Sequence, residues 1–205
     1  MTRNSNRTGS VSLESELKVL YEISEMVQQS AIEPNSFEEI LKKLGKVVDY
    51  RSASLFTVSR NEAKLEEIST IGRRVDLIDF VKFDLGSGIS AWVAKQQRPI
   101  MLNNLRKTKG GTHTRSFLSA PIVFVNETIG ILNLAHDEPD AFNNRDVEIV
   151  GLLSSTLALL IERIAYQKEL AFSSDELRSK TVELEIAKKK LNSIQDLQNT
   201  NELVV

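Results

Sequence analysis

Leucine recurs every seven residues near the end of this chain, and that spacing constrains the fold more than any other feature of the sequence. The row consists of Leu170, Leu177, Leu184 and Leu191. Seven residues make about two turns of an α-helix, so the row forms one apolar stripe of the kind that pairs helices in a coiled coil. A continuous helix from Leu170 to Val205 would be about 50 Å long. One small domain cannot cover such a stripe, and we therefore predict a homodimer.

Five apolar residues before this row also follow heptad spacing: Val150, Leu153, Leu157, Leu160 and Ile164. The step from Ile164 to Leu170 is six residues, so the two rows are out of phase by one residue. The segment Ser173-Ser174-Asp175-Glu176 lies near that slip and offers capping residues for a new helix. We predict a bend or a change of phase there, and a linker helix over residues 171–205.

The first half of the chain indicates two shorter helices. Residues 1–10 are polar and are expected to be disordered. An apolar stripe then predicts a helix whose inward face would meet a second copy: Leu13, Leu17, Leu20, Ile23 and Val27. Ser36 is placed to cap a second helix that follows the break at Pro34.

Strand patterns occupy the middle of the chain. Residues 52–58 and 64–71 predict one hairpin, and residues 116–125 and 128–136 predict another around a tight turn at Asn126-Glu127. A short strand is expected at 100–102, and Asn143, with Asp146 three residues on, is placed to cap the last helix. The order predicts an α+β fold with a central antiparallel sheet of about six strands, helices on one face and a loop-roofed cavity on the other. We place this domain at residues 11–170 with its flanking helices.

Composition narrows the class of protein. The 205 residues include no cysteine and only two histidines, so thiolate chemistry and a multi-histidine metal site are excluded. The formal net charge of −2 gives no general attraction to nucleic acid or to a membrane surface. No apolar run approaches the roughly 20 residues that span a bilayer, and the first ten residues do not resemble a secretory signal. We expect a cytoplasmic protein without nucleic-acid or membrane partners.

The stretch Gly86-Ser87-Gly88 comes directly before a short helical pattern, whose Ile89, Trp92 and Val93 are expected to point inward. Glycine permits a close approach of ligand atoms to the main chain, and the free N–H groups at the start of a helix favour an anion such as phosphate. A tight turn with nothing bound fits these residues equally well.

Taken together, these segments resemble the GAF domain, the small-molecule sensor module of signalling proteins. The stretch 86–94 (GSGISAWVA) resembles the family's G-x-G-[IL]-[AS]-x-x-V-A segment. The following elements occur in the family's order: Arg98-Pro99-Ile100, residues 116–122 (SFLSAPI), residues 129–132 (IGIL), and Phe142 with Asp146 in an F-x3-D pattern. The resemblance covers roughly residues 17–168. It implies the fold but leaves the ligand open, because the fold hosts many ligands.

Among the ligands of this family, a cyclic nucleotide suits these residues best, and the resemblance to the GAF domains that bind one implies where it would lie. The phosphate would lie at Gly88-Ile89-Ser90, Thr114 would contact the ligand, and Asn133 on the last strand would read the base. Because an amide both donates and accepts, Asn133 favours the edge of adenine and thus cAMP over cGMP. The residues themselves add further polar candidates: Ser54, Ser87, Thr112 and His113, with Arg73, Arg74 and Arg115 as weaker candidates for the phosphate. A buried amide satisfied by the backbone is an equally good interpretation of Asn133.

Other ligands remain open at this point. The cyclic-nucleotide subgroup carries an Asn-Lys pair that aligns here with His136-Asp137, so the lysine–aspartate bridge of that subgroup is missing. A haem would need His113 or His136 as its axial ligand. The small residues Ser54, Ser90 and Ser119 indicate an open cavity, whereas a filled pocket would leave a purely structural dimerisation module.

We find no catalytic constellation in the sequence, and the lack of cysteine excludes both a cysteine-attached bilin and thiol-based methionine sulfoxide reduction. We therefore expect a regulatory domain with no covalent cofactor. It would relay ligand occupancy through a dimeric coiled coil to an output domain such as a diguanylate cyclase or histidine kinase.

Overall fold

The computed structural model describes residues 12–28, 35–58, 65–72, 89–105 and 114–202. The chain falls into two compact units, residues 1–162 and 163–205. The elements of the first unit are, in chain order, α1 (Leu13–Gln28), α2 (Ser36–Leu44), β1 (Ser52–Val58), β2 (Leu65–Gly72), α3 (Ile89–Gln96), β3 (Ile100–Leu102), β4 (Ser116–Phe124), β5 (Glu127–His136) and the start of α4 (Asn144–Glu202). Residues 1–10 lie outside the described residues, and the predicted domain boundary after residue 170 stays a prediction.

The strands form one antiparallel sheet in the order β2-β1-β5-β4-β3. The predicted α+β fold and both hairpins are confirmed, but the described residues contain five strands where about six were expected. The turn between β4 and β5 lies at Val125 and Asn126, one residue earlier than predicted. Both residues have positive φ angles, 46° and 65°, which is the backbone of a tight two-residue hairpin turn.

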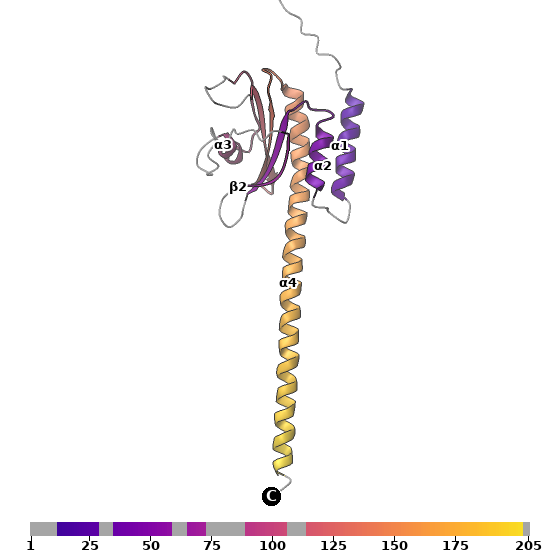
Figure 1. Cartoon of the computed structure of the whole chain (residues 1–205), viewed down its shortest axis with the longest axis vertical. Coiled ribbons are helices and arrows are strands. Elements are labelled where there is room, and N and C mark those ends of the chain that lie inside the picture. Colours follow the sequence, from indigo (N-terminus) through magenta and orange to yellow (C-terminus); the bar gives the residue numbers. More distant parts are fainter. Residues whose placement is uncertain (1–11, 29–34, 59–64, 73–88, 106–113, 203–205) are drawn as a thin grey trace, which may run out of the picture. The chain divides into compact units, whose positions relative to one another are not determined.

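Helices lie on both faces of the sheet, which corrects the prediction that they lie on one. Figure 1 shows α3 on one side of the sheet, with α2 and the first turns of α4 on the other and α1 outside α2. The face toward α2 and α4 carries fully buried apolar side chains: Leu55, Leu118, Ile122, Leu132 and Leu134. The two helices supply Ile40, Leu41, Leu44, Val150, Leu153 and Leu157, each 0% exposed. This layer is the hydrophobic core.

Two helix starts differ in how closely they follow the prediction. Asn143 caps α4 as expected. Its side-chain oxygen accepts a hydrogen bond from the backbone N–H of Arg145 at 2.8 Å, and the Asp146 carboxylate accepts one from the backbone N–H of Asn143, also at 2.8 Å. At α2 the helix begins at Ser36 itself, and Asn35 is the residue at the cap position. The predicted capping role of Ser36 is therefore wrong by one residue.

The predicted stripe of α1 is divided between two sides of the helix. Ile23 and Val27 are buried, together with Val19 and Glu16, whereas Leu13 and Leu17 are 63% and 58% exposed. The buried Glu16 carboxylate accepts a hydrogen bond from the guanidinium of Arg145 in the first turn of α4. Packing on α2 and this ion pair select the buried side, so only part of the stripe is available to a second copy.

α4 is helical without interruption from Asn144 to Glu202, so Ser173-Ser174 does not start a new helix. Within the first unit, the row Val150, Leu153, Leu157 and Leu160 is buried in the core. The leucines of the second row are exposed instead, with Leu170, Leu177 and Leu184 between 64% and 73% and Leu191 at 56%. The shift of phase between the two heptad rows thus marks a change in environment along one helix. The first row packs in the core of its own domain, and the second row is exposed.

No helix in the described part of the chain is long and apolar enough to cross a membrane.

Candidate functional site

The site is built around α3, which is fixed to the sheet at its C-terminal end. Thr128 at the start of β5 donates a hydrogen bond to the Ala94 carbonyl at 2.7 Å. The Gln97 side chain donates to the Asn126 carbonyl in the β4–β5 turn, also at 2.7 Å. At the other end of the helix, Ser90 is 2% exposed and lies within 3.4 Å of the Asn133 amide nitrogen. These contacts define the face of the sheet that α3 covers.

Polar side chains form a row across this face. In the register of the sheet, Ser54 on β1 lies opposite both Thr70 on β2 and Asn133 on β5, and Asn133 lies opposite Ser119 on β4. Side chains alternate between the faces of a strand, so residues paired in register share a face. We name Thr70, Ser54, Asn133 and Ser119 the polar row. The row crosses four strands beneath α3.

Several atoms on this face have no hydrogen-bond partner among the described residues. The Ser119 hydroxyl, the Asn133 side-chain oxygen and the hydroxyl of the nearby Ser52 are all buried and unpaired. Thr70, by contrast, donates to the Ser54 hydroxyl at 2.9 Å. Buried polar groups are nearly always satisfied, because an unpaired one costs about 1–3 kcal/mol. Buried polar groups without partners that gather on one face of a sheet are typical of a binding site without its ligand.

The surroundings of the polar row are mostly apolar on β1, β4 and β5, whereas the exposed Glu67 of β2 lies opposite Phe56 in register. In register, Phe56, Ile131 and Pro121 form the next row on one side, and Phe117 and Ala135 lie on the other. β1, β4 and β5 place no ionisable side chain on this face within the described residues. Arg115 comes directly before β4, and its Nε is buried without a partner in the part of the chain that the structure describes. The site therefore has a hydrogen-bonding floor, and the cationic residue Arg115 lies directly before the start of β4.

Three of the predicted site residues come together as expected. Ser54, Ser90 and Asn133 meet at the polar row, and Ile89 begins α3 one residue before Ser90. Thr114 is 6% exposed and lies two residues before β4, toward the end of the sheet and away from the row. Four predicted residues lie outside the described residues, as do Arg73 and Arg74: Ser87, Gly88, Thr112 and His113. Their roles stay predictions.

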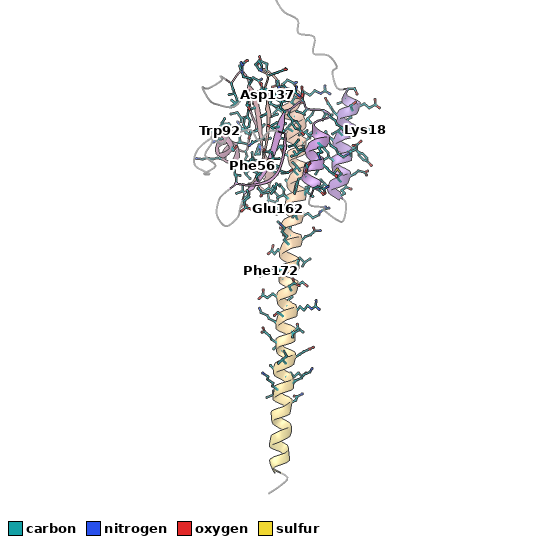
Figure 2. All side chains as sticks on the ribbon, in the orientation of Figure 1. Lys18, Phe56, Trp92, Asp137, Glu162 and Phe172 are labelled. Carbon is teal, nitrogen blue, oxygen red and sulfur yellow. The ribbon has the colours of Figure 1, made fainter. Side chains whose placement is uncertain are left out.

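Two other predictions are wrong. The predicted inward face of α3 included Trp92, but its side chain is 47% exposed (Figure 2), whereas Val93 and Ser90 of the same helix are buried. His136 was a candidate haem ligand. It is 2% exposed, its Nδ1 accepts from the Glu138 N–H at 3.0 Å, and its Nε2 lies 3.6 Å from an Asp49 carboxylate oxygen. Because β5 turns His136 away from the α3 face, this residue supports the strand end and not the site.

Sequence reasoning missed Ser52 and Thr70, and it named Ser119 only for its small size. Ser119 lies between Leu118 and Ala120, and this alternation was visible in the sequence. Ser52 is the first residue of β1 and Thr70 follows the polar Ser69, so alternation alone did not identify them. What the sequence did not contain was the register that sets them beside Asn133, because a slip of one residue would turn each side chain to the other face.

The start of α4 is tied to the segments that flank residues 106–113. The Asn103 amide donates to the Phe142 carbonyl at 3.1 Å, and the Asn104 amide donates to Asp140 at 2.8 Å. The Ser116 hydroxyl donates to the Glu138 carbonyl at 2.8 Å and accepts from the Ala141 N–H at 3.1 Å. These bonds connect both ends of the β3–β4 connection to the segment that leads into α4.

No group of three or more histidine and acidic side chains within the described residues is arranged to hold a metal ion. The candidate site thus offers hydroxyl, amide and guanidinium groups, which recognise a ligand by hydrogen bonding.

Comparison with known families agrees with this architecture. The family profile described as the GAF domain matches residues 37–162, more than half of the chain. The chain belongs to the GAF domain family. The matched region runs from α2 through the five strands to the end of the first unit, so it contains the whole polar row.

This GAF domain is also similar to longer proteins. It is 22% identical over 181 residues to the Nif-specific regulatory protein of Herbaspirillum seropedicae, an alignment that covers 82% of this chain and 33% of that protein. The chain therefore spans about a third of the length of this relative. A match to a regulatory protein agrees with the predicted sensor module.

Three solved structures share the fold. The GAF domain of a phosphoenolpyruvate-protein phosphotransferase from Coxiella burnetii is 20% identical, with a TM-score of 0.64 over 76% of this chain and 98% of that one. The GAF domain of a sensor histidine kinase from Pseudomonas syringae is 18% identical, with a TM-score of 0.58 over 78% and 94%. Free methionine-R-sulfoxide reductase from Neisseria meningitidis is 15% identical, with a TM-score of 0.61 over 75% and 93%. The fold thus serves both regulatory proteins and enzymes.

Proposed function

We propose that this GAF domain is a non-catalytic, cytoplasmic sensor that binds a cyclic nucleotide, cAMP in preference to cGMP, on the α3 face of its sheet. The observation that carries this proposal is the polar row with its unpaired, buried atoms. A nucleotide supplies both an uncharged hydrogen-bonding edge for Asn133 and an anionic group for Arg115 and for the backbone N–H groups at the start of α3. A regulatory protein among the relatives supports the sensor role.

A ligand would enter the site by replacing the contact between Ser90 and Asn133. At 3.4 Å the contact is longer than the usual range of about 2.7–3.2 Å for an N–H···O hydrogen bond. A ligand group that takes over the Asn133 amide therefore replaces a weak contact with a shorter one. Because α3 is fixed by its other end, its first turn is the part that would adjust.

Calorimetric titration of the full chain with cAMP, and then with cGMP, tests the proposal. We expect heat of binding with cAMP and weaker binding of cGMP. Ser90→Arg places a long charged side chain against Asn133 and should abolish binding, while Gln96→Arg adds the same charge at an exposed position of the same helix and should not. Asn133→Ala serves as a second variant with less steric effect. If Ser90→Arg binds like the wild type, the assignment of the site to this face is wrong.

We further propose that occupancy is relayed to an output domain, such as a diguanylate cyclase or histidine kinase, through a homodimer. The exposed leucines of the second unit, which repeat every seven residues, support a coiled coil with a second copy. The hydrogen bonds from Asn103, Asn104 and Ser116 support a path from the site to the start of this helix. A ligand would act by binding one arrangement of the dimer more tightly than the other.

Sedimentation of a double variant tests the dimer. Leu177→Lys with Leu184→Lys removes two large apolar side chains per chain from the stripe and should weaken self-association by roughly 100-fold or more. Asp175→Lys with Ser179→Lys adds lysines to the opposite side of the same helix and should leave the dimer intact. An unchanged mass in the leucine variant would contradict pairing through this stripe. A stable dimer that binds neither nucleotide would instead favour the structural dimerisation module.

A further inference from the structure

We propose that Ser119 contacts the ligand and that, with Asn133, it reads an uncharged edge in which an N–H donor lies beside a hydrogen-bond acceptor, as in a nucleobase or a carboxamide. This inference rests on the proposed sensor function and specifies which part of the ligand faces the sheet. It assigns to Ser119 a role that the sequence pattern did not.

The geometry of the β4–β5 pair places the two groups side by side. Ser119 and Asn133 are directly opposite in the register, and side chains opposite each other in an antiparallel pair have Cβ atoms about 4.5–5.5 Å apart. Despite this closeness, the Ser119 hydroxyl and the Asn133 oxygen remain unpaired among the described residues. Ser119 is 0% exposed. Two adjacent polar groups that do not satisfy each other are free to bind one third group.

The chemistry of the pair defines that group. The Asn133 oxygen only accepts, so it requires a donor, such as the N–H of a nucleobase or an amide, whereas the Ser119 hydroxyl can donate to an acceptor next to it. A charged group at this point would lose its hydration without a counter-charge, because β1, β4 and β5 carry no ionisable side chain on this face within the described residues. The flanking side chains of Phe56 and Phe117 are apolar and suit the faces of a flat, uncharged ring or amide.

A buried serine elsewhere in the domain provides a matched control. Ser154 on α4 is 3% exposed, and its hydroxyl also has no partner in the described part of the chain, but it lies on the helix that packs on the other face of the sheet. Both Ser119→Ala and Ser154→Ala remove one unpaired hydroxyl and leave the methylene in place. Ser119 lies on a strand of the proposed site, whereas Ser154 lies on a helix outside it, so Ser154→Ala reports the loss of an unpaired hydroxyl away from the site.

The test combines stability and binding, with the full-length wild type and both variants. Without ligand, Ser119→Ala should melt at the wild-type temperature or higher, because it loses no hydrogen bond; loss of a satisfied hydroxyl would lower the Tm by about 2–4 °C. Binding is then measured with cAMP and with three uncharged probes, adenosine, guanosine and nicotinamide. We expect at least one uncharged probe to bind, Ser119→Ala to weaken it roughly tenfold, and Ser154→Ala to leave it unchanged.

The outcomes separate this inference from the proposed function. If neither cAMP nor cGMP binds, but an uncharged probe binds and its affinity depends on Ser119, the assignment of a cyclic nucleotide is wrong and the recognition of an uncharged edge by Ser119 and Asn133 stands. If cAMP binds equally to wild type and Ser119→Ala, the sensor stands and the role of Ser119 is overturned. A lower Tm in Ser119→Ala would also overturn it, because the hydroxyl would then have a partner in the free protein. Absence of binding by all three uncharged probes would overturn it as well.

Discussion

Replacement of Ser116 by alanine should loosen the connection between the sheet and α4. Ser116 is 0% exposed, and its hydroxyl makes two hydrogen bonds, one to the Glu138 carbonyl and one from the Ala141 N–H. Each bond contributes about 0.5–1.5 kcal/mol, and the buried Ala141 N–H would be left without a partner. We therefore expect Ser116→Ala to reduce the free energy of unfolding by roughly 2–3 kcal/mol. For a chain of this size that loss lowers the Tm by about 4–12 °C.

Thermal unfolding followed by circular dichroism measures the effect, and Ser154→Ala is the control. Ser154 is as deeply buried as Ser116 but its hydroxyl is unpaired among the described residues, so that variant should melt near the wild-type temperature. Hydrogen exchange should also become faster at residues 138–142 in Ser116→Ala, because the bonds that hold this segment to β4 are gone. If the two variants melt within about 1 °C of each other, the bridge through Ser116 contributes no stability and the reasoning fails.

Two further predictions concern pH. Burial raises the pKa of Tyr50 to about 12, so the phenol ionises first in the unfolded chain and the free energy of unfolding falls as the pH rises from 10 to 12. Tyr50→Phe should remove roughly 1 kcal/mol of this alkaline loss of stability. Equal denaturation midpoints for the two proteins across this pH range would refute the prediction. The hydrogen bond from Lys43, at 2.6 Å, lowers the pKa of Glu22 below 4.5. The stabilisation by Glu22 is therefore present above pH 4.5 and is lost as the pH falls through the lowered pKa. The difference in stability between wild type and Glu22→Gln should shrink with acidification. A constant difference between their urea midpoints would contradict a stabilising ion pair.

Local features of the fold were predictable because they depend on residues close together in the chain. Alternation over residues 52–58 and 128–136 predicted the hairpins, and the Asn143 cap with Asp146 marked the start of α4. Backbone sterics, side-chain periodicity and capping act within one or two turns or strands. The glycine-rich stretch before α3 and the order of the later elements were enough to indicate the GAF fold.

The site was predictable only in part. Ser54 was identified from its polarity at a strand position, and Ser90 and Asn133 from the resemblance to the family. The structure brings the three residues together. The roles of Ser52, Thr70 and Ser119 depend on strand register, which is set by pairing between segments far apart in the sequence. A single-residue difference in register would have removed them from the site without any change in their own strands.

The sequence by itself determined the helices, the strands and the seven-residue repeat, because each follows from a periodicity that the residues carry. Only the tertiary structure decided which side of each element is buried. It turned Leu13 and Leu17 outward on α1, exposed Trp92 on α3, and buried Leu153 and Leu157 of α4 while Leu177 stayed exposed. An apolar stripe specifies that a face needs a partner but not which partner. The competition among packing surfaces within the folded chain makes that choice.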